Sequence, residues 1–376
     1  MTNGLLPEGL RDRLPPHAEA ADKLVRQVID TIHAHGYARV QPPLIEFEEE
    51  LAGRLKGTHK SDLFRMVDPV SQRSLAARPD ITAQIGRIAT TRLDGAARPL
   101  RLGYGGPVLK LRSTQLRPER EMCQAGAELI GSDSVAAARE VIQLALSSLV
   151  ATGARDVTLD LTLPDLVETL AVSALPLPAA KVDAVRARLD AKDAGGLAAL
   201  GAEAYLPLLA AAGRLPEALG HLRTINLGAD VETRLTAIES IAAAIDPAVR
   251  ITFDPTERHG FEYQTWLGFS LFCAGVSGEV GRGGSYTIVH ADCREEAAIG
   301  FSLYLDPLVD AGLGQTEVRR IFLPLATDPE VAAQLRATGW VTVAALAATD
   351  DAHALGCTHR LEANEPIELA AGARAA

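Results

Sequence analysis

The stretch from Pro99 to Ile130 constrains the fold of this chain most strongly. It contains the apolar segments PLRLGY and VLKLR, then the polar loop STQLRPE, then REMCQAGAELI. Short runs in which apolar and polar side chains alternate, separated by a polar loop, predict strands that pair with each other. We therefore expect an antiparallel sheet in this part of the chain.

Helical patterns surround these strands. Apolar residues recur at helical spacing from Leu24 to Ile32 and the run ends at Gly36, which predicts an amphipathic helix. A second helix is predicted from Ser134 to Val150, followed by an alternating strand, DVTLDLT, at 156–162. Residues 176–250 are rich in Ala and Leu without a strand pattern, so we expect a small helical insertion there.

The last third of the chain mixes both patterns. ITF and GFEYQTWLGFSLFC predict strands, and the turn GRGGSY (281–286) predicts a tight hairpin. The segment EEAAIGFSLYLDPLVDAG (295–312) is expected to be a helix that ends at a domain boundary. Beyond it, RRIFLPLA, DPEVAAQLRATG and WVTVAAL predict a strand, a helix and a strand. The predicted fold class is α+β, with a core of residues 1–312 and a small α/β region of residues 313–376.

Charge and composition exclude several classes of protein. The chain has 37 Lys and Arg against 48 Asp and Glu, a net charge of −11, which argues against non-specific nucleic-acid binding. Apolar runs stop well before the roughly 18 residues of a membrane span, and the N-terminus lacks a signal-peptide pattern, so we expect a cytoplasmic protein. The four cysteines form no CxxC pair and the histidines are scattered, so no metal site or cofactor is expected.

The strand REMCQAGAELI carries a candidate binding face. Because side chains alternate across a sheet, Gln124, Gly126 and Glu128 share one face, and the apolar Cys123 and its alternate neighbours share the other. An amide and a carboxylate on either side of a glycine suit the floor of a pocket for a cationic or amino-bearing ligand. An ordinary solvated face explains the same pattern.

Cations cluster just before that strand. Lys110, Arg112, Arg117 and Arg120 lie within eleven residues and could hold a phosphate or a carboxylate. A solvated loop explains these four side chains equally well.

Taken together, these segments resemble the histidyl-tRNA synthetase branch of the class II aminoacyl-tRNA synthetases over most of residues 4–312. Six family motifs have counterparts in the same order along the chain. The family's R-P-E-G-T, G-P-x-F-R and R-x-F-H-Q-x-G-x-E are matched by RPDIT (78–82), GPVLK (106–110) and REMCQAGAE (120–128). Its R-G-L-D-Y-Y, G-G-R-Y-D and A-x-G-F-x-x-G-L-E-R-L are matched by RHGFEY (258–263), GGSYT (283–287) and AIGFSLYLDPL (298–308).

The resemblance implies an antiparallel class II core and an amino-acid pocket. The residues that it implies for this pocket are Asp80, Thr82, Lys110, Gln124, Glu128, Arg258 and Tyr263.

Three departures from the family pattern bear on activity. An active synthetase holds the phosphates of ATP with two arginines, and the corresponding positions here are Lys110 and Pro307. Lysine keeps the charge but lacks the planar fork of donors, and proline has neither. Tyr304 also replaces a glycine. Losing such preorganised cations removes stabilisation of the transition state. We therefore expect a pocket that binds an amino acid without activating it.

This combination resembles the regulatory subunits of ATP phosphoribosyltransferase, the first enzyme of histidine biosynthesis. The resemblance implies that the chain has no catalytic activity, that it binds and activates a separate short-form catalytic subunit, and that it supports feedback inhibition by histidine. It also implies a dimer within a hetero-octamer and no tRNA role. An active histidyl-tRNA synthetase, from which Pro307 separates it, and a synthetase-like protein with another role remain as alternatives.

Overall fold

The computed structural model describes residues 5–52, 55, 63–111, 119–258 and 264–369. The chain forms two compact units, Met1–Gly314 and Gln315–Ala376.

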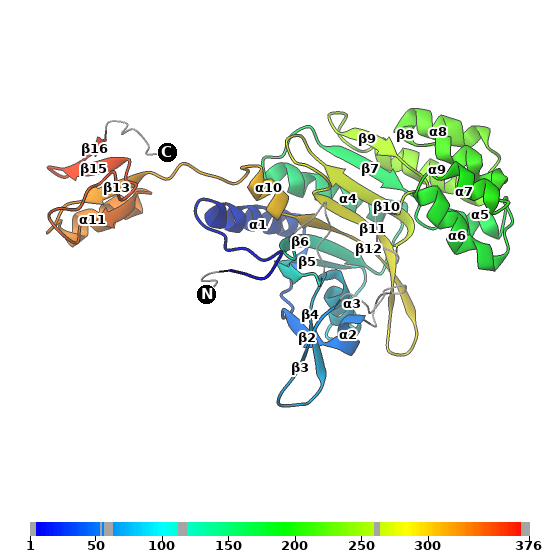
Figure 1. The fold of residues 1–376 in the computed structure, drawn as a ribbon, viewed down its shortest axis with the longest axis horizontal. Helices are drawn as coiled ribbons and strands as arrows, with labels where there is room; N and C mark the ends of the chain where they lie inside the picture. The colour runs from blue at the N-terminus through cyan, green and yellow to red at the C-terminus, as the bar shows by residue number, and fades with distance from the viewer. Residues whose placement is uncertain (1–4, 53–54, 56–62, 112–118, 259–263, 370–376) are drawn as a thin grey trace. The chain divides into compact units, whose positions relative to one another are not determined.

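A nine-stranded sheet is the framework of the first unit (Figure 1). Its strands, in spatial order, are β1 (Ala38–Arg39), β5 (Leu100–Leu109), β6 (Glu121–Ile130), β12 (Glu295–Tyr304), β11 (Gly281–Val289), β10 (Gln264–Phe272), β7 (Thr158–Thr162), β9 (Arg250–Phe253) and β8 (Gly213–Arg214). Neighbours from β5 to β7 are antiparallel, which confirms the predicted antiparallel sheet. PLRLGY and VLKLR form one continuous strand, β5, rather than two.

Two long helices cover one face of this sheet. Helices α1 (His17–Ala34) and α4 (Val135–Ala151) occur where the sequence predicts them. The Ser134 side chain caps α4 by accepting a hydrogen bond from the Ala137 N–H at 3.3 Å. Helix α1 lies close to the sheet, because a β-carbon at Gly103 would be 2.5 Å from Ile32 Cγ2. Alternate β6 residues, among them Ala125, are fully buried beneath these helices.

The opposite face is also covered. Helix α3 (Thr82–Thr91) packs there beside α2 (Glu48–Ala52) and a small sheet ordered β2 (Ile45–Phe47), β4 (Ser74–Ala77), β3 (Phe64–Val67). Gln124 and Glu128 of β6 are buried on this side. A solvated face is therefore the wrong reading of the second set of alternating residues.

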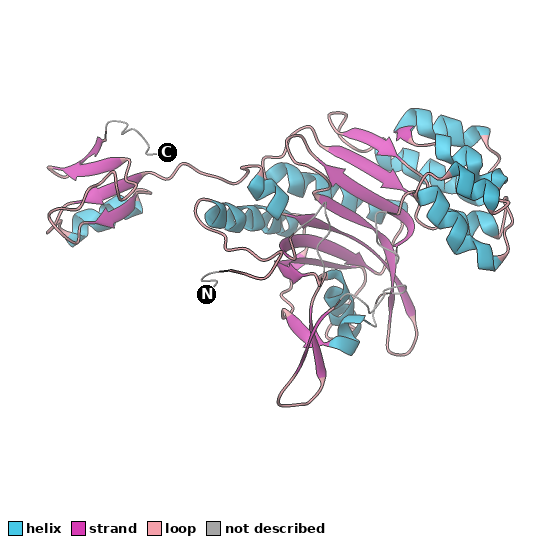
Figure 2. Cartoon of the chain, in the orientation of Figure 1, coloured by secondary structure: helices cyan, strands magenta, loops and turns pink. Residues whose placement is uncertain are grey.

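The insertion is helical, as predicted, and Figure 2 shows its helices gathered at one end of the sheet, beyond β7 and β9. Its elements, with the preceding α5, are α5 (Leu166–Ala171), α6 (Ala179–Asp190), α7 (Ala194–Ala199), η1 (Glu203–Ala210), α8 (Leu215–Thr224) and α9 (Ala229–Ala242). The expectation of no strand within residues 176–250 is wrong, because Gly213 and Arg214 pair with Phe253 and Thr252 as β8.

Two predictions in the last third of the core are also wrong. Residues 295–304 form the strand β12 and not a helix; only α10 (Asp306–Asp310) is helical. The strand is buried on both faces between β6 and β11, so its nearly continuous apolar run does not show the alternation of a half-exposed strand. Residues 281–286 form part of β11 rather than a hairpin turn.

The second unit is a small α/β domain. Its sheet is ordered β14 (Val341–Ala344), β13 (Arg320–Leu323), β15 (His359–Glu362), β16 (Glu365–Glu368), and helix α11 is Pro329–Ala337. The predicted order of strand, helix and strand is confirmed by β13, α11 and β14, whereas β15 and β16 were not anticipated. No helix among the described residues is long and apolar enough to span a membrane.

Candidate functional site

Glu128 lies at the centre of a buried polar network on the α3 side of the sheet. Its side chain is 1% exposed, and its Oε1 and Oε2 accept hydrogen bonds from the hydroxyls of Tyr104 (2.9 Å) and Tyr286 (2.8 Å). Burial raises the pKa of Glu128 to about 8, although the two tyrosine hydrogen bonds oppose that shift. The group can therefore exchange a proton near neutral pH.

The network continues through Gln124 to the start of α3. The Gln124 Nε2 donates to Ser302 Oγ at 2.5 Å and to Asp80 Oδ2 at 2.8 Å. Asp80 Oδ1 in turn accepts from the Thr82 N–H at 2.7 Å. The Ser302 and Tyr104 hydroxyls are 2.9 Å apart and join this branch to Glu128. Four of the residues implied by the resemblance, Asp80, Thr82, Gln124 and Glu128, thus belong to one hydrogen-bonded group.

Glycines on three adjacent strands form the floor beside Glu128. The strand registers align Gly268, Gly284, Gly300 and Glu128 in one row across the sheet. A β-carbon at Gly300 would be 1.6 Å from Glu128 Oε2, and one at Gly284 would be 2.7 Å from Gln264 Nε2. The side chains of Glu128 and Gln264 therefore lie flat against the glycines, where any larger residue would displace them.

The space left above this floor is small. A cavity of about 20 Å³ remains, enough for one water molecule. Its lining residues are Thr82, Glu128, Gln264, Arg282, Gly283, Gly284, Tyr286, Gly300, Phe301 and Ser302. Asp80 and Gln124, two of the residues implied for the pocket, are not among the residues that line this cavity. Their side chains form hydrogen bonds with Thr82 and Ser302 instead. Gln264 lies against the glycine floor and lines this cavity.

The remaining predicted site residues lie elsewhere. Lys110 ends near the ring of Tyr304, with 5.8 Å between Nζ and the ring centroid. The Arg258 N–H donates to Asp190 Oδ1 at 3.3 Å, and Arg258 is not among the described residues that line the cavity. Tyr263 lies outside the described residues.

The cationic cluster after β5 is only partly described. Arg112 and Arg117 lie outside the described residues, while Arg120 uses its guanidinium on the carbonyls of Glu8 (3.3 Å) and Lys110 (3.2 Å). Arg120 therefore holds the N-terminal segment against the end of β5.

Tyr304 and α10 occupy the positions of the sequence departures. The Tyr304 side chain is 4% exposed, and the guanidinium of Arg282 lies 6.0 Å from the same ring that Lys110 approaches. Pro307 lies in the first turn of α10, where it offers no donor. Its neighbour Asp306 accepts the Cys123 N–H at 2.6 Å and pairs with the Arg13 guanidinium. Asp306 therefore links α10 to β6 and to the N-terminal segment that carries Arg13.

Three residues of this network, Tyr104, Tyr286 and Ser302, and the cavity-lining Gln264 are not among the site residues that the sequence indicates. Tyr286 and Ser302 lie within matched motifs, but Tyr104 and Gln264 do not. Alternation along β5 and β12 assigns Tyr104 and Ser302 to a face, yet only the strand register shows that this is the face of Glu128.

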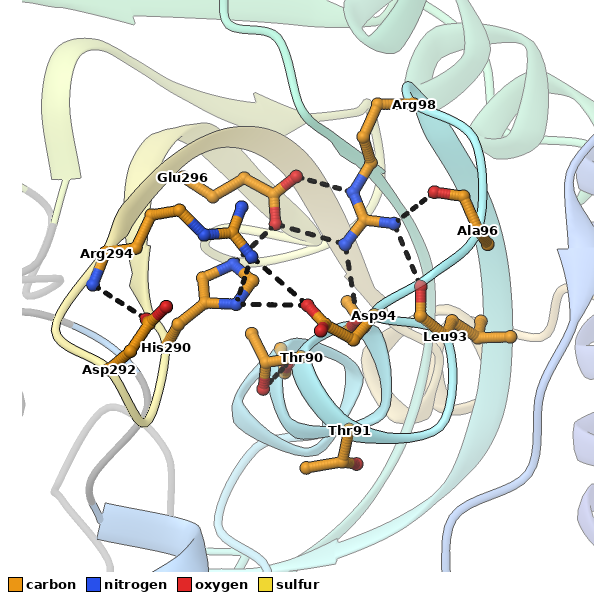
Figure 3. Close-up of polar contacts among 12 residues, drawn as sticks. Thr90, Thr91, Leu93, Asp94, Ala96, Arg98, His290, Asp292, Arg294 and Glu296 are labelled. Atoms are coloured by element: carbon orange, nitrogen blue, oxygen red, sulfur yellow. Dashed lines mark hydrogen bonds and ion pairs between the residues drawn. The ribbon is translucent and has the colours of Figure 1, made fainter.

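A second cluster of polar and charged side chains, partly buried, joins the end of α3 to the β11–β12 hairpin (Figure 3). The Arg98 Nε and Nη2 donate to the two oxygens of Glu296 at 2.5 and 3.3 Å. The His290 Nε2 lies 2.9 Å from Glu296 Oε2, and Arg294 contacts both His290 and Asp94. No group of three or more metal-ligating side chains occurs among the described residues.

Comparisons with known proteins agree with this architecture. A family model described as histidyl-tRNA synthetase matches residues 9–308. The ATP phosphoribosyltransferase regulatory subunit of Rhodospirillum centenum is 44% identical over 365 residues, covering 94% of each chain. That of Paramagnetospirillum magneticum is 42% identical over 375 residues, covering 97% of this chain and 98% of the relative. The chain belongs to the family of ATP phosphoribosyltransferase regulatory subunits.

Solved structures show the same fold. An ATP phosphoribosyltransferase regulatory subunit/histidyl-tRNA synthetase from Bacillus halodurans aligns with a TM-score of 0.80 at 24% identity, covering 95% of this chain and 96% of that one. A chain of the ATP phosphoribosyl transferase (HisG:HisZ) complex from Thermotoga maritima aligns with a TM-score of 0.60 at 18% identity, covering 76% of this chain and 97% of that one. The regulatory-subunit family thus shares the class II synthetase fold, as the sequence predicted.

Proposed function

We propose that this chain binds and activates a separate short-form catalytic subunit of ATP phosphoribosyltransferase and has no catalytic activity of its own. Membership of the regulatory-subunit family supports this role. The observation that carries the absence of synthetase activity is the buried Tyr304 ring, which Lys110 Nζ and the Arg282 guanidinium approach to 5.8 and 6.0 Å from its centroid. Lys110 and Pro307 stand at the two positions where the resemblance implies phosphate-binding arginines, so neither position supplies a planar guanidinium to a triphosphate.

Two assays test this role. Mixing the purified chain with a short-form catalytic subunit should raise phosphoribosyl transfer to ATP above the rate of either protein alone. Equal rates with and without the chain would refute activation. Histidine-dependent pyrophosphate exchange by the chain alone should stay at background, because adenylation lacks its cationic clamps. A rate well above background would favour an active synthetase.

We also propose that the Glu128 pocket takes up histidine or a similar amino acid during feedback inhibition. A carboxyl group that titrates near neutrality can pair with a protonated imidazole or donate to a neutral one. A charge-assisted hydrogen bond to a buried group is worth roughly 1.5 to 3 kcal/mol, so Glu128→Ala should weaken binding by about ten- to a hundredfold. Glu128 bracing the sheet is the alternative. Calorimetric titration of histidine, with a melting curve for each protein, separates the two.

The assembly and location remain part of the proposal. We expect a dimer of this chain within a hetero-octamer, in the cytoplasm, without a tRNA partner. The four cysteines are all free thiols, in keeping with a reducing compartment. Native mass spectrometry of the mixture with the catalytic subunit tests the stoichiometry, and a tRNA gel-shift assay tests the expected absence of tRNA binding.

A further inference from the structure

One lysine connects the helical insertion to the segment that leads to Arg258. Lys192 lies in the turn between α6 and α7, and its Nζ donates to Asp254 Oδ2 at 2.5 Å and to Thr256 Oγ1 at 2.8 Å. Asp254 and Thr256 are buried, at 8% and 4% exposure. Beside this contact, Asp190 at the end of α6 accepts the Arg258 N–H at 3.3 Å. The insertion therefore contacts residues 254–258 at both ends.

The other side of this segment is attached to the sheet. The Asp254 N–H donates to the Leu161 carbonyl at 3.0 Å, directly after β9 ends. The other oxygen of the Asp254 carboxylate, Oδ1, accepts hydrogen bonds from both the N–H and the hydroxyl of Thr256 at 3.0 Å. Asp254 thus receives hydrogen bonds both from its own segment and from the insertion.

The backbone of Lys192 carries an independent sign of constraint. Its φ of 53° lies in the left-handed region, which costs a non-glycine residue on the order of 1 kcal/mol. Glycine would adopt this conformation without strain. Lys192 thus makes its two hydrogen bonds to Asp254 and Thr256 from a strained backbone conformation.

We propose that Lys192 is a positioning residue through which the helical insertion sets the placement of the Arg258 segment. Six residues further along the chain from Arg258, Gln264 lines the candidate cavity, so the insertion would influence that cavity from outside the synthetase-like core. The effect on ligand binding rests on the proposed function of that pocket, whereas the effect on the segment itself does not.

The test uses the unusual backbone of Lys192. Lys192→Gly removes the ion pair with the buried Asp254 carboxylate, and relief of the strained turn offsets part of that loss, so the melting temperature of the full chain should fall only slightly. Hydrogen–deuterium exchange of the amides at 256–258 should nevertheless rise at least about tenfold. Lys192→Arg should retain most of the protection, since arginine can still reach the Asp254 carboxylate.

Asp156→Gly is the matched control. Asp156 also has a left-handed φ, of 50°, and its side chain makes no hydrogen bond within the described part of the chain. This variant should leave exchange at 256–258 as in the wild type. Unchanged exchange in Lys192→Gly would overturn the proposal. If Lys192→Gly melts at a much lower temperature, Lys192→Met, which keeps the side-chain length and the strained turn, should still raise exchange locally.

Histidine titration of the complex with the catalytic subunit gives the second measurement. If the wild type binds histidine, Lys192→Gly should weaken binding at least about fivefold, and equal affinity would overturn the coupling to the pocket. If the wild type binds no histidine, the proposed ligand of the pocket is wrong, and the exchange experiment alone decides the role of Lys192.

Discussion

The carboxylate of Glu128 lies directly against Gly300 on the neighbouring strand, so that a β-carbon on Gly300 would be 1.6 Å from Oε2. The Ala127 carbonyl oxygen would also be only 2.7 Å away. Two groups, one of them backbone, therefore leave room for glycine alone. This contact explains how a carboxyl side chain can lie flat on a fully covered sheet.

We predict that Gly300→Ala destabilises the chain by about 2 to 4 kcal/mol, since overpacking a buried site forces the backbone or Glu128 to move. Chemical denaturation measures this loss. Gly220→Ala in α8 is the matched control, because nothing lies within 4 Å of its added β-carbon, and it should be neutral or slightly stabilising.

Removing Glu128 should relieve part of that clash. In a Glu128→Ala background, Gly300→Ala should cost less than in the wild type, but still more than zero because of the Ala127 carbonyl. Equal costs in the two backgrounds would contradict the contact.

The second prediction concerns pH. Burial raises the pKa of Glu128 to about 8, so the folded state keeps the proton to a higher pH than the unfolded state does. The group's contribution to stability is greatest below its unfolded pKa, near 4.5, and declines as pH rises to about 8. In that window the slope cannot exceed roughly 1.4 kcal/mol per pH unit.

Glu128→Gln isolates this dependence. The amide does not titrate, and the hydroxyls of Tyr104 and Tyr286 can turn to donate or accept. The unfolding free energy of the wild type minus that of Glu128→Gln should therefore fall between pH 5 and 8. A flat difference across this range would show that Glu128 does not carry the shift.

The third prediction compares two arginines that both pair with α10. The Arg13–Asp306 pair is largely buried, with side-chain exposures of 24% and 5%, whereas Arg11–Asp310 is exposed at 44% and 40%. Arg13→Met leaves a buried carboxylate with the Cys123 N–H, and should cost about 2 to 4 kcal/mol. Arg11→Met should cost less than about 1 kcal/mol. Urea denaturation checks both, and similar losses would contradict the assigned burial.

The fourth prediction concerns Arg98, shown in Figure 3. Its guanidinium binds Glu296 through two nitrogens and also donates to the carbonyls of Leu93 and Ala96 at 3.0 and 2.9 Å. Lysine cannot reproduce this planar set, so Arg98→Lys should destabilise the chain by about 2 kcal/mol. Arg294→Lys, whose side chain is half exposed, should have a smaller effect on thermal unfolding.

Arg98 also bears on acid stability. Burial would raise the pKa of Glu296, but hydrogen bonds from Arg98 and His290 outweigh it and lower the pKa. Glu296 therefore stabilises the fold above its unfolded pKa, and this contribution is lost as pH falls through the lowered folded value. Arg98→Lys should reduce the loss on acidification, because the pKa of Glu296 moves back toward its ordinary range.

Elements with a clear local pattern could be predicted from the sequence. The helix at His17–Ala34 has one buried apolar face, the helix at Val135–Ala151 begins after the N-cap Ser134, and in β6 Gln124, Gly126 and Glu128 alternate with apolar residues, so each segment contains its own signal. The same alternation assigned Gln124 and Glu128 to one face. The family motifs indicated the fold, and the chemistry of Lys110 and Pro307 argued against adenylation from the sequence alone.

The features that the sequence did not predict depend on how distant strands pair. Strand β12 is covered on both faces. Burial on both sides removes the alternation that identifies a strand, so the local sequence of this segment predicts a helix instead. The row of Gly268, Gly284, Gly300 and Glu128 depends on the register of four strands that are far apart in the sequence. The position of Gln264 beside Gly284 depends on the same register. Amino-acid order determined the local periodicity and residue chemistry of this protein, whereas pairing between distant strands, which no local pattern encodes, decided which side chains meet in the pocket.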